Sequence, residues 1–178
     1  MRYCISTVRF SIFINGAPDV SFLAQRGLRQ GDLLSPFLFI IVMEGLNNMI
    51  KMGRENECLR GFEVATSPTS NSTGNMEVTH LQYADNMLIF CDADERQLLI
   101  LRLALVLFEG VSRLHINWRK SQLYPINEVS NMVDLSGILG GEIGSLPTMY
   151  LGMRLGAKSK TLNIWNPVIE KCDKKLTR

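Results

Sequence analysis

Residues 78–91 read VTHLQYADNMLIFC, in which two apolar runs, Val78–Gln82 and Met87–Cys91, flank a polar turn that carries Asp85 and Asn86. The length and the composition of the two runs predict the strands of a β-hairpin. At the tip of a tight hairpin the Asp85 side chain is exposed, while the strands fix its backbone. This arrangement suits a ligand for a hard cation. A second carboxylate beside Asp85 would double the negative charge available to a cation, but the next residue is an asparagine.

The residues upstream predict another hairpin and then a buried helix. An Asn-Gly pair at 15–16 is a strong turn signal between two short extended runs, Phe10–Asn15 and Val20–Gln25. Ser35 supplies a helix N-cap, and a proline follows it at the first helical position. The apolar stretch beyond this proline predicts a helix that ends near Gly53.

The residues downstream of the central hairpin alternate between helical and extended patterns. Asp92 and Asp94 are acidic residues placed to cap a strongly apolar helix that runs to about Arg113. Further elements are predicted as a strand at Leu123–Ile126, a helix at Ser130–Leu139, a strand at Met149–Leu155 and a last helix from Asn166. Two hairpins among packed helices predict an α+β fold, and no internal repeat or linker divides the chain.

The composition is that of one ordinary globular domain: 178 residues, 46% apolar and 20% charged, with a formal net charge of +2. The four cysteines are widely spaced, which argues against a zinc site and against a disulfide scaffold. We therefore expect an intracellular protein, nuclear or cytoplasmic, that is not secreted. The apolar runs are too short for a membrane span. Basic residues gather after Met153, seven against two acidic ones.

The segment Gly27–Pro36, GLRQGDLLSP, is a second candidate site. Its glycines let the backbone come close to a ligand, and Gln30 can both donate and accept hydrogen bonds. The helix that follows presents the positive end of its dipole. An ordinary loop with a helix cap has the same residues, so physical chemistry alone leaves both interpretations open.

Four motifs, taken in order, resemble reverse transcriptases of non-LTR, LINE-type retrotransposons. Gly27–Pro36 resembles the family's GLRQGDPLSP box, and the turn at Tyr83–Asn86 resembles its YADD box at about the expected distance downstream. Leu114–Ser121 is similar to the segment around an Asn and a Lys-Ser pair, and Leu146–Gly156 is similar to the LPxxYLG segment. The resemblance covers essentially the whole chain.

The resemblance implies the fold and its division. The chain would be one partial reverse transcriptase domain over residues 1–178, built as a polymerase palm in which helices pack on an RRM-like antiparallel sheet. Residues 1–34 would hold a hairpin and the nucleotide-side loop, 35–145 the palm, and 146–178 the primer-side segment and the start of a thumb.

The resemblance also implies two-metal nucleotidyl transfer from dNTPs to a DNA primer on an RNA template, with Mg²⁺ and possibly Mn²⁺ as the ions. Asp85 would be a metal ligand. The catalytic residues would be Asp85, Asn86 and Lys120. The residues near nucleotide and template would be Gln30, Gly31, Ser35 and Tyr83. Those on the primer side would be Tyr150, Leu151 and Gly152.

Two departures from the family pattern predict an inactive chain. Asn86 stands where a second Asp is usual, which removes a negative charge where two divalent cations must be held. The family also has a metal-binding Asp on a strand upstream of the first hairpin, and we expect this chain, which starts at Met1, to lack that strand. Binding of Mg²⁺ by this chain is therefore expected to be weak.

Other functions remain open from the residues alone. The basic C-terminal stretch would equally serve a non-catalytic module that binds RNA or DNA phosphates. The chain could also be a remnant without function. A small metal hydrolase that uses Asp32 and Asp85 is the weakest alternative, because the sequence places no general base or third ligand beside them. The oligomeric state does not follow from the sequence.

Overall fold

The computed structural model describes residues 9–23, 31–64, 76–157 and 165–176. Within these ranges the fold is α+β, because helices alternate with small two-stranded sheets. The chain divides into two compact units, Met1–Ile116 and Asn117–Arg178. Each unit is built around its own elements, and the single-domain division expected from the resemblance stays a prediction.

The first hairpin is confirmed. Strands β1 (Arg9–Ile14) and β2 (Ala17–Leu23) pair antiparallel around a turn at Asn15 and Gly16. Both turn residues have a positive φ, 52° and 82°, which asparagine and glycine tolerate better than other residues. The register shifts between the pairs Ser11–Ser21 and Phe13–Pro18, where β2 has one residue more than β1. The predicted end of the second strand, Gln25, lies outside the described residues.

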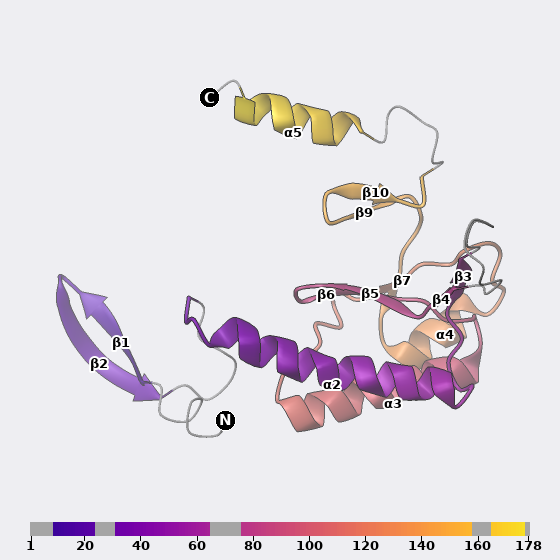
Figure 1. Ribbon diagram of the computed structural model, residues 1–178, viewed down its shortest axis with the longest axis horizontal. Helices are drawn as coiled ribbons and strands as arrows, with labels where there is room; N and C mark the ends of the chain where they lie inside the picture. Colours follow the sequence, from indigo (N-terminus) through magenta and orange to yellow (C-terminus); the bar gives the residue numbers. More distant parts are fainter. Residues whose placement is uncertain (1–8, 24–30, 65–75, 158–164, 177–178) are drawn as a thin grey trace, which may run out of the picture. The chain divides into compact units, whose positions relative to one another are not determined.

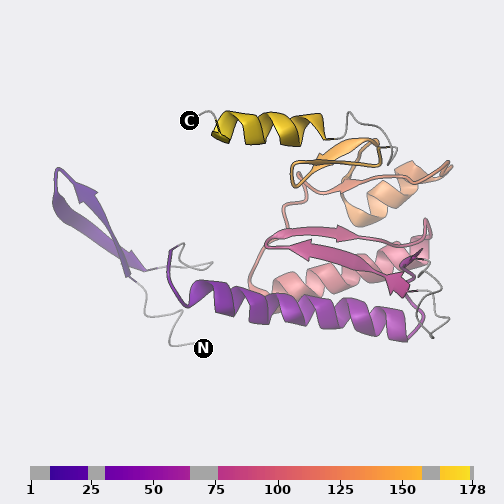
Figure 2. The same cartoon turned by 45° about the horizontal axis from the view of Figure 1, so that its top comes forward.

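Two long helices, α2 (Ser35–Glu55) and α3 (Glu95–Ser112), form the core of the first unit. Figure 1 and Figure 2 show them side by side. The backbone N–H of Arg60, just after α2, donates to the side chain of Gln97 in the first turn of α3, so the helices run antiparallel. The buried apolar residues of this unit are Met43, Leu46, Ile50, Leu59, Leu98, Leu101, Leu105 and Phe108.

The two helix starts differ from each other. As predicted, Asp94 caps α3, and its carboxylate accepts a hydrogen bond of 3.2 Å from the backbone N–H of Gln97. The predicted N-cap role of Ser35 is wrong, because α2 begins at Ser35 itself and Leu34 holds the cap position without a side-chain bond. The Ser35 hydroxyl instead donates to the Asp32 carboxylate at 3.4 Å, which turns it away from the helix N–H groups.

Two hairpins connect α2 to α3. The strands are β3 (Phe62–Val64), β4 (Met76–Val78), β5 (His80–Tyr83) and β6 (Asn86–Ile89), paired antiparallel as β3–β4 and β5–β6. The ring centroids of Phe62 and Phe90 lie 6.2 Å apart, so the β3–β4 hairpin contacts the residue that follows β6.

The second unit begins with a strand–helix–strand crossover. Strands β7 (Gln122–Leu123) and β8 (Glu142–Ile143) are parallel, and α4 (Met132–Leu139) connects them. The helix predicted at Ser130–Leu139 is thus confirmed within two residues. The strand predicted at Leu123–Ile126 is shorter and begins one residue earlier.

The predicted strand at Met149–Leu155 is wrong, because the structure has a hairpin there. Strands β9 (Thr148–Tyr150) and β10 (Met153–Leu155) pair antiparallel around Leu151 and Gly152. These turn residues have φ of 50° and 84°, so the chain reverses where the apolar pattern predicts continuation. The last helix, α5 (Asn166–Leu176), begins where predicted.

Each sheet formed by the described residues has only two strands. The continuous RRM-like sheet of a palm therefore stays a prediction, as does the absence of an upstream strand. Among the same residues, no helix combines the length and the apolar character needed to cross a membrane.

Candidate functional site

Asp85 lies at the tip of the tight hairpin that the sequence predicts. Tyr83 pairs with Asn86, so Ala84 and Asp85 form a two-residue turn, and all four residues are exposed. Ala84 has a φ of 51°, in the left-handed region that costs a residue with a Cβ about 1 kcal/mol. The side-chain amide of Gln82 donates to the Ala84 carbonyl at 3.2 Å and supports this turn. The hairpin thus holds one carboxylate in solvent on a strained backbone.

The Asn86 side chain is directed at Asp85. Its Nδ2 donates to Asp85 Oδ1 at 3.4 Å. An amide N–H group cannot coordinate a cation, so the nitrogen that Asn86 directs at Asp85 adds no ligand beside this carboxylate. Two carboxylates at this turn would instead repel each other and attract a cation.

The described residues do not fit a divalent-cation site by themselves. Hard cations such as Mg²⁺ take six oxygen ligands and are held by carboxylates with substrate phosphates or waters. Within the described ranges, no three His, Cys, Asp or Glu side chains come together in a group that could hold an ion. Asp85 contributes one carboxylate, and its neighbour contributes an amide.

The loop before α2 is described only from Gly31 onward, and Gln30 lies outside that range. Gly31 has a φ of 84°, and a Cβ placed on it would meet no atom of the described residues within 4 Å. Backbone conformation is therefore the local reason for a glycine at this position. The Ser35 side chain is buried and bonded to Asp32, whose carbonyl also accepts the Ser35 N–H at 3.3 Å. Asp32 thus stabilises its own turn.

Four of the predicted site residues belong to the second unit. Leu151 is 48% exposed and holds the first position of the β9–β10 turn, while the preceding Tyr150 is half-buried. A Cβ on Gly152 would lie 3.4 Å from Nζ of Lys171, so this lysine reaches the turn from α5. Lys120 is exposed, and its backbone N–H bonds the Asn117 carbonyl at 2.9 Å. Their assigned roles stay predictions.

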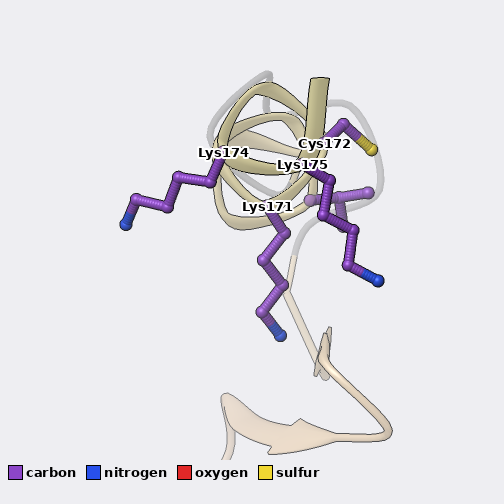
Figure 3. A pocket seen from close by; sticks show the side chains of 5 residues that line it. Lys171, Cys172, Lys174 and Lys175 are labelled. Atoms are coloured by element: carbon purple, nitrogen blue, oxygen red, sulfur yellow. The ribbon is translucent and has the colours of Figure 1, made fainter. Parts of the chain in front are cut away.

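A shallow hollow runs along α5 in the second unit. It is bordered by Val168, Lys171, Cys172, Lys174 and Lys175, all from this one helix. Figure 3 shows the three lysines projecting outward from the helix. A hollow with a single helix for its wall is an open, basic surface and not an enclosed binding cavity.

Gln97 is a structural residue that the sequence reasoning missed. Its Oε1 accepts the backbone N–H of Arg60 at 3.0 Å and that of Asp92 at 3.4 Å, and its Nε2 donates to the Asp92 carboxylate at 3.1 Å. This one side chain thereby connects three segments: the residues that follow α2, the residues that follow the β5–β6 hairpin, and the first turn of α3. Asp94 and Gln97 have the spacing of a capping box, but that motif directs the Gln97 side chain at the Asp94 N–H, which here donates to the Asp92 carbonyl at 2.8 Å, so the motif does not identify these contacts.

Cys91, which follows the hairpin, is predicted to resist thiol reagents. Burial, with the Asp92 carboxylate as a smaller cause, raises the pKa of the Cys91 thiol from 9.0 to about 11. A two-unit rise lowers the thiolate fraction at pH 8 about 100-fold, and the thiolate is the reactive form. Mass spectrometry after iodoacetamide treatment is expected to show Cys91 modified at least about tenfold more slowly than the exposed Cys172.

Labelling in concentrated urea is the control for this prediction, because unfolding removes the burial and should bring the two rates together. Equal rates for Cys91 and Cys172 in the folded protein would contradict the prediction.

Comparison with known proteins agrees with the motifs. Residues 2–155 match the family described as reverse transcriptase (RNA-dependent DNA polymerase). The chain is also 36% identical over 86 residues to an uncharacterized mitochondrial protein of Arabidopsis thaliana. That match covers 48% of this chain and 65% of the relative, so the chain spans just under two thirds of the curated relative it matches.

Proposed function

This chain belongs to the reverse transcriptase (RNA-dependent DNA polymerase) family, and we propose that it is the palm part of a non-LTR, LINE-type reverse transcriptase. The observation that carries the proposal is the exposed Asp85 on its two-residue hairpin turn, inside the matched residues and downstream of the Gly27–Pro36 box. The reaction of the complete enzyme would be RNA-templated DNA synthesis, with dNTPs, an RNA template and a DNA primer as its partners.

The residues have distinct roles in this proposal. Asp85 presents a carboxylate at the reacting end of the primer, and Tyr83, also exposed, lies beside it on β5. Gly31, whose positive φ favours a glycine, would lie at the nucleotide side. Lys171 brings a positive charge to the Gly152 turn, where it would neutralise a backbone phosphate of the primer strand.

We further propose that the chain by itself does not extend a primer. Nucleotidyl transfer in the two-metal manner needs several carboxylates at one point. The described residues supply Asp85 as the one carboxylate at the turn, and the Asn86 amide adds no negative charge beside it. The chain by itself is therefore expected to bind Mg²⁺ weakly and to catalyse no metal-dependent nucleotidyl transfer.

A chimera tests the proposed function. Residues 9–157 would replace the equivalent segment of an active non-LTR reverse transcriptase, and primer extension would be measured with Mg²⁺. The Asn86→Asp chimera is expected to extend the primer at least about tenfold faster than the unchanged chimera, because a carboxylate both adds charge and stops donating to Asp85. Asp85→Asn is expected to abolish extension.

Asn48→Asp is the matched control, since it adds the same charge at an exposed site on α2, outside the turn. Equal rates for Asn86→Asp and the unchanged chimera would show that the turn does not limit the reaction. If every chimera, including Asn86→Asp, is inactive while the intact parent is active, the proposed function is rejected.

A further inference from the structure

The side chain of Tyr124 joins two parts of the second unit, the β7–α4–β8 crossover and the β9–β10 hairpin. Tyr124 directly follows β7 and is half-buried. Its hydroxyl donates a hydrogen bond to the side-chain oxygen of Gln122 on β7. The same hydroxyl lies 3.3 Å from the hydroxyl of Thr148, the first residue of β9. One phenol group therefore contacts both parts.

The direction of these hydrogen bonds follows from the donors available. A phenol has a single O–H group, and the Tyr124 hydrogen is directed at Oε1 of Gln122, which only accepts. The Thr148 hydroxyl is then the donor to the Tyr124 oxygen. The three side chains form two consecutive hydrogen bonds that run from β9 through Tyr124 to β7. Consecutive hydrogen bonds of this kind strengthen each other.

Gly144 gives the Tyr124 ring the space that it occupies. Gly144 directly follows β8, and its N–H donates to the Leu123 carbonyl at 2.8 Å. A Cβ placed on Gly144 would lie 2.9 Å from both Cδ1 and Cζ of the ring, so any larger residue would displace it. The ring is thus held against the backbone of the crossover, while its hydroxyl reaches the hairpin.

The β9–β10 hairpin depends on contacts of this kind. It has only three residue pairs, between Thr148–Tyr150 and Met153–Leu155. A two-stranded hairpin by itself is at best marginally stable in water. Its turn also places Leu151 at a φ of 50°, a conformation that is unfavourable for leucine. Contacts outside the hairpin must therefore contribute to its order.

We propose that Tyr124 is a positioning residue for the β9–β10 hairpin, and that its hydroxyl fixes the hairpin on the crossover through Thr148. The consequence for binding rests on the proposed function, in which Tyr150, Leu151 and Gly152 support the primer strand. A turn that is already held in place loses less conformational entropy when it binds a nucleic-acid backbone. Loss of the Tyr124 hydroxyl is therefore expected to loosen the hairpin and to weaken binding of a primer–template duplex.

Hydrogen exchange measured by mass spectrometry on the full chain tests the contact. Tyr124→Phe keeps the ring and removes only the hydroxyl, so amides of residues 148–155 are expected to exchange about three- to tenfold faster. Thr148→Val removes the other hydroxyl and should also speed their exchange. Because both substitutions delete one shared hydrogen bond, the double variant should exchange no faster than the more affected single variant. Amides of α3, in the first unit, should keep their protection in all three variants.

Matched variants separate this contact from general damage. Ser145→Ala removes an exposed hydroxyl between β8 and β9 and should leave the exchange of residues 148–155 unchanged. Gly144→Ala should speed that exchange, because the added methyl group displaces the Tyr124 ring. Gly137→Ala, in the interior of α4, should not, because a Cβ on Gly137 would meet no atom of the described residues within 4 Å.

Duplex binding separates a positioning role from a purely stabilising one. Fluorescence anisotropy at low ionic strength would measure the affinity of the full chain for an RNA–DNA duplex that ends in a primer terminus. Tyr124→Phe is expected to raise Kd at least about threefold, while circular dichroism shows unchanged melting of the helices. The salt dependence of Kd should keep its slope in Tyr124→Phe, which removes no positive charge, whereas Lys171→Gln should reduce the slope.

Three results would overturn the proposal. Tyr124→Phe could leave the exchange of residues 148–155 unchanged. The effects of Tyr124→Phe and Thr148→Val could add in the double variant, which would mean that the two hydroxyls act separately. Faster exchange with an unchanged Kd would reject the positioning role. If the wild-type protein does not bind the duplex, the proposed primer-side function fails instead, and the exchange results still decide whether the Tyr124 hydroxyl holds the hairpin.

Discussion

Ile50→Ala is expected to lower the free energy of unfolding of the first unit by about 2–5 kcal/mol. Ile50 has no exposed surface, and it lies on the side of α2 that forms the core with α3. Alanine removes three carbon atoms from this position. The surrounding side chains relax only partly around such a deletion, so the lost apolar burial is accompanied by the cost of a cavity.

The measurement is urea unfolding followed by circular dichroism at 222 nm, a helix signal to which α2 and α3, the two longest of the described helices, contribute most. Fluorescence is unsuitable, because both tryptophans, Trp118 and Trp165, belong to the second unit. Met52→Ala on the same helix is the control. Met52 is 61% exposed, so the change should stay within about 0.5 kcal/mol. Similar effects of the two substitutions would contradict the assigned core.

Gly61→Ala is expected to destabilise the first unit by about 1–3 kcal/mol, because the added methyl group has no room. A Cβ on Gly61 would lie 2.7 Å from the carbonyl carbon of Val78 and 2.9 Å from the backbone nitrogen of Thr79. These are backbone atoms, which cannot move aside as a side chain does. The Gly61 N–H also donates to Glu77 at 2.5 Å, so displacement of the residue strains that bond as well.

The expected damage extends to the candidate site. Val78 and Thr79 lead directly into β5, so pushing them away from Gly61 moves the base of the hairpin that carries Asp85. Hydrogen exchange should therefore show faster opening at Phe90, whose N–H bonds the Thr79 carbonyl at 2.8 Å.

Gly45→Ala is the matched control and should have the opposite sign. Gly45 is exposed in the interior of α2, and a Cβ there would meet nothing within 4 Å. Alanine at such a position is expected to stabilise the helix by about 0.5–1 kcal/mol. If both glycine substitutions shift the urea midpoint in the same direction, the close approach of Gly61 to the Val78 and Thr79 backbone does not explain the effect of Gly61→Ala.

Much of the candidate site could be predicted from short stretches of sequence. The exposed Asp85 on a two-residue turn follows from two apolar runs around a polar tip. The Asp94 cap follows from an acidic residue before an apolar helix. The β9–β10 hairpin could not be predicted in this way, because Leu151 is not a turn residue and its left-handed φ of 50° contradicts its local preference.

The bridging role of Gln97 was also out of reach, since its partner Arg60 lies 37 residues earlier in the chain. The same holds for the faces of the first hairpin. An Asn-Gly pair predicts the hairpin, but it does not place the register shift that leaves one extra residue in β2 between Pro18 and Ser21.

The amino-acid sequence alone determined the helices α2, α3 and α5, the hairpin turns at Asn15-Gly16 and at Asp85, and the family of the chain. Turns, caps and hydrophobic periods depend on residues only a few positions apart, so they can be recognised without coordinates. Only the tertiary structure decided that Ile50 is buried and Ile40 exposed on one helix, that Gly61 touches backbone, and that Asn86 donates to Asp85. These features depend on contacts between segments that are distant in sequence and on the orientation of side chains. Local preferences allow several such arrangements at similar energy, and packing selects one of them.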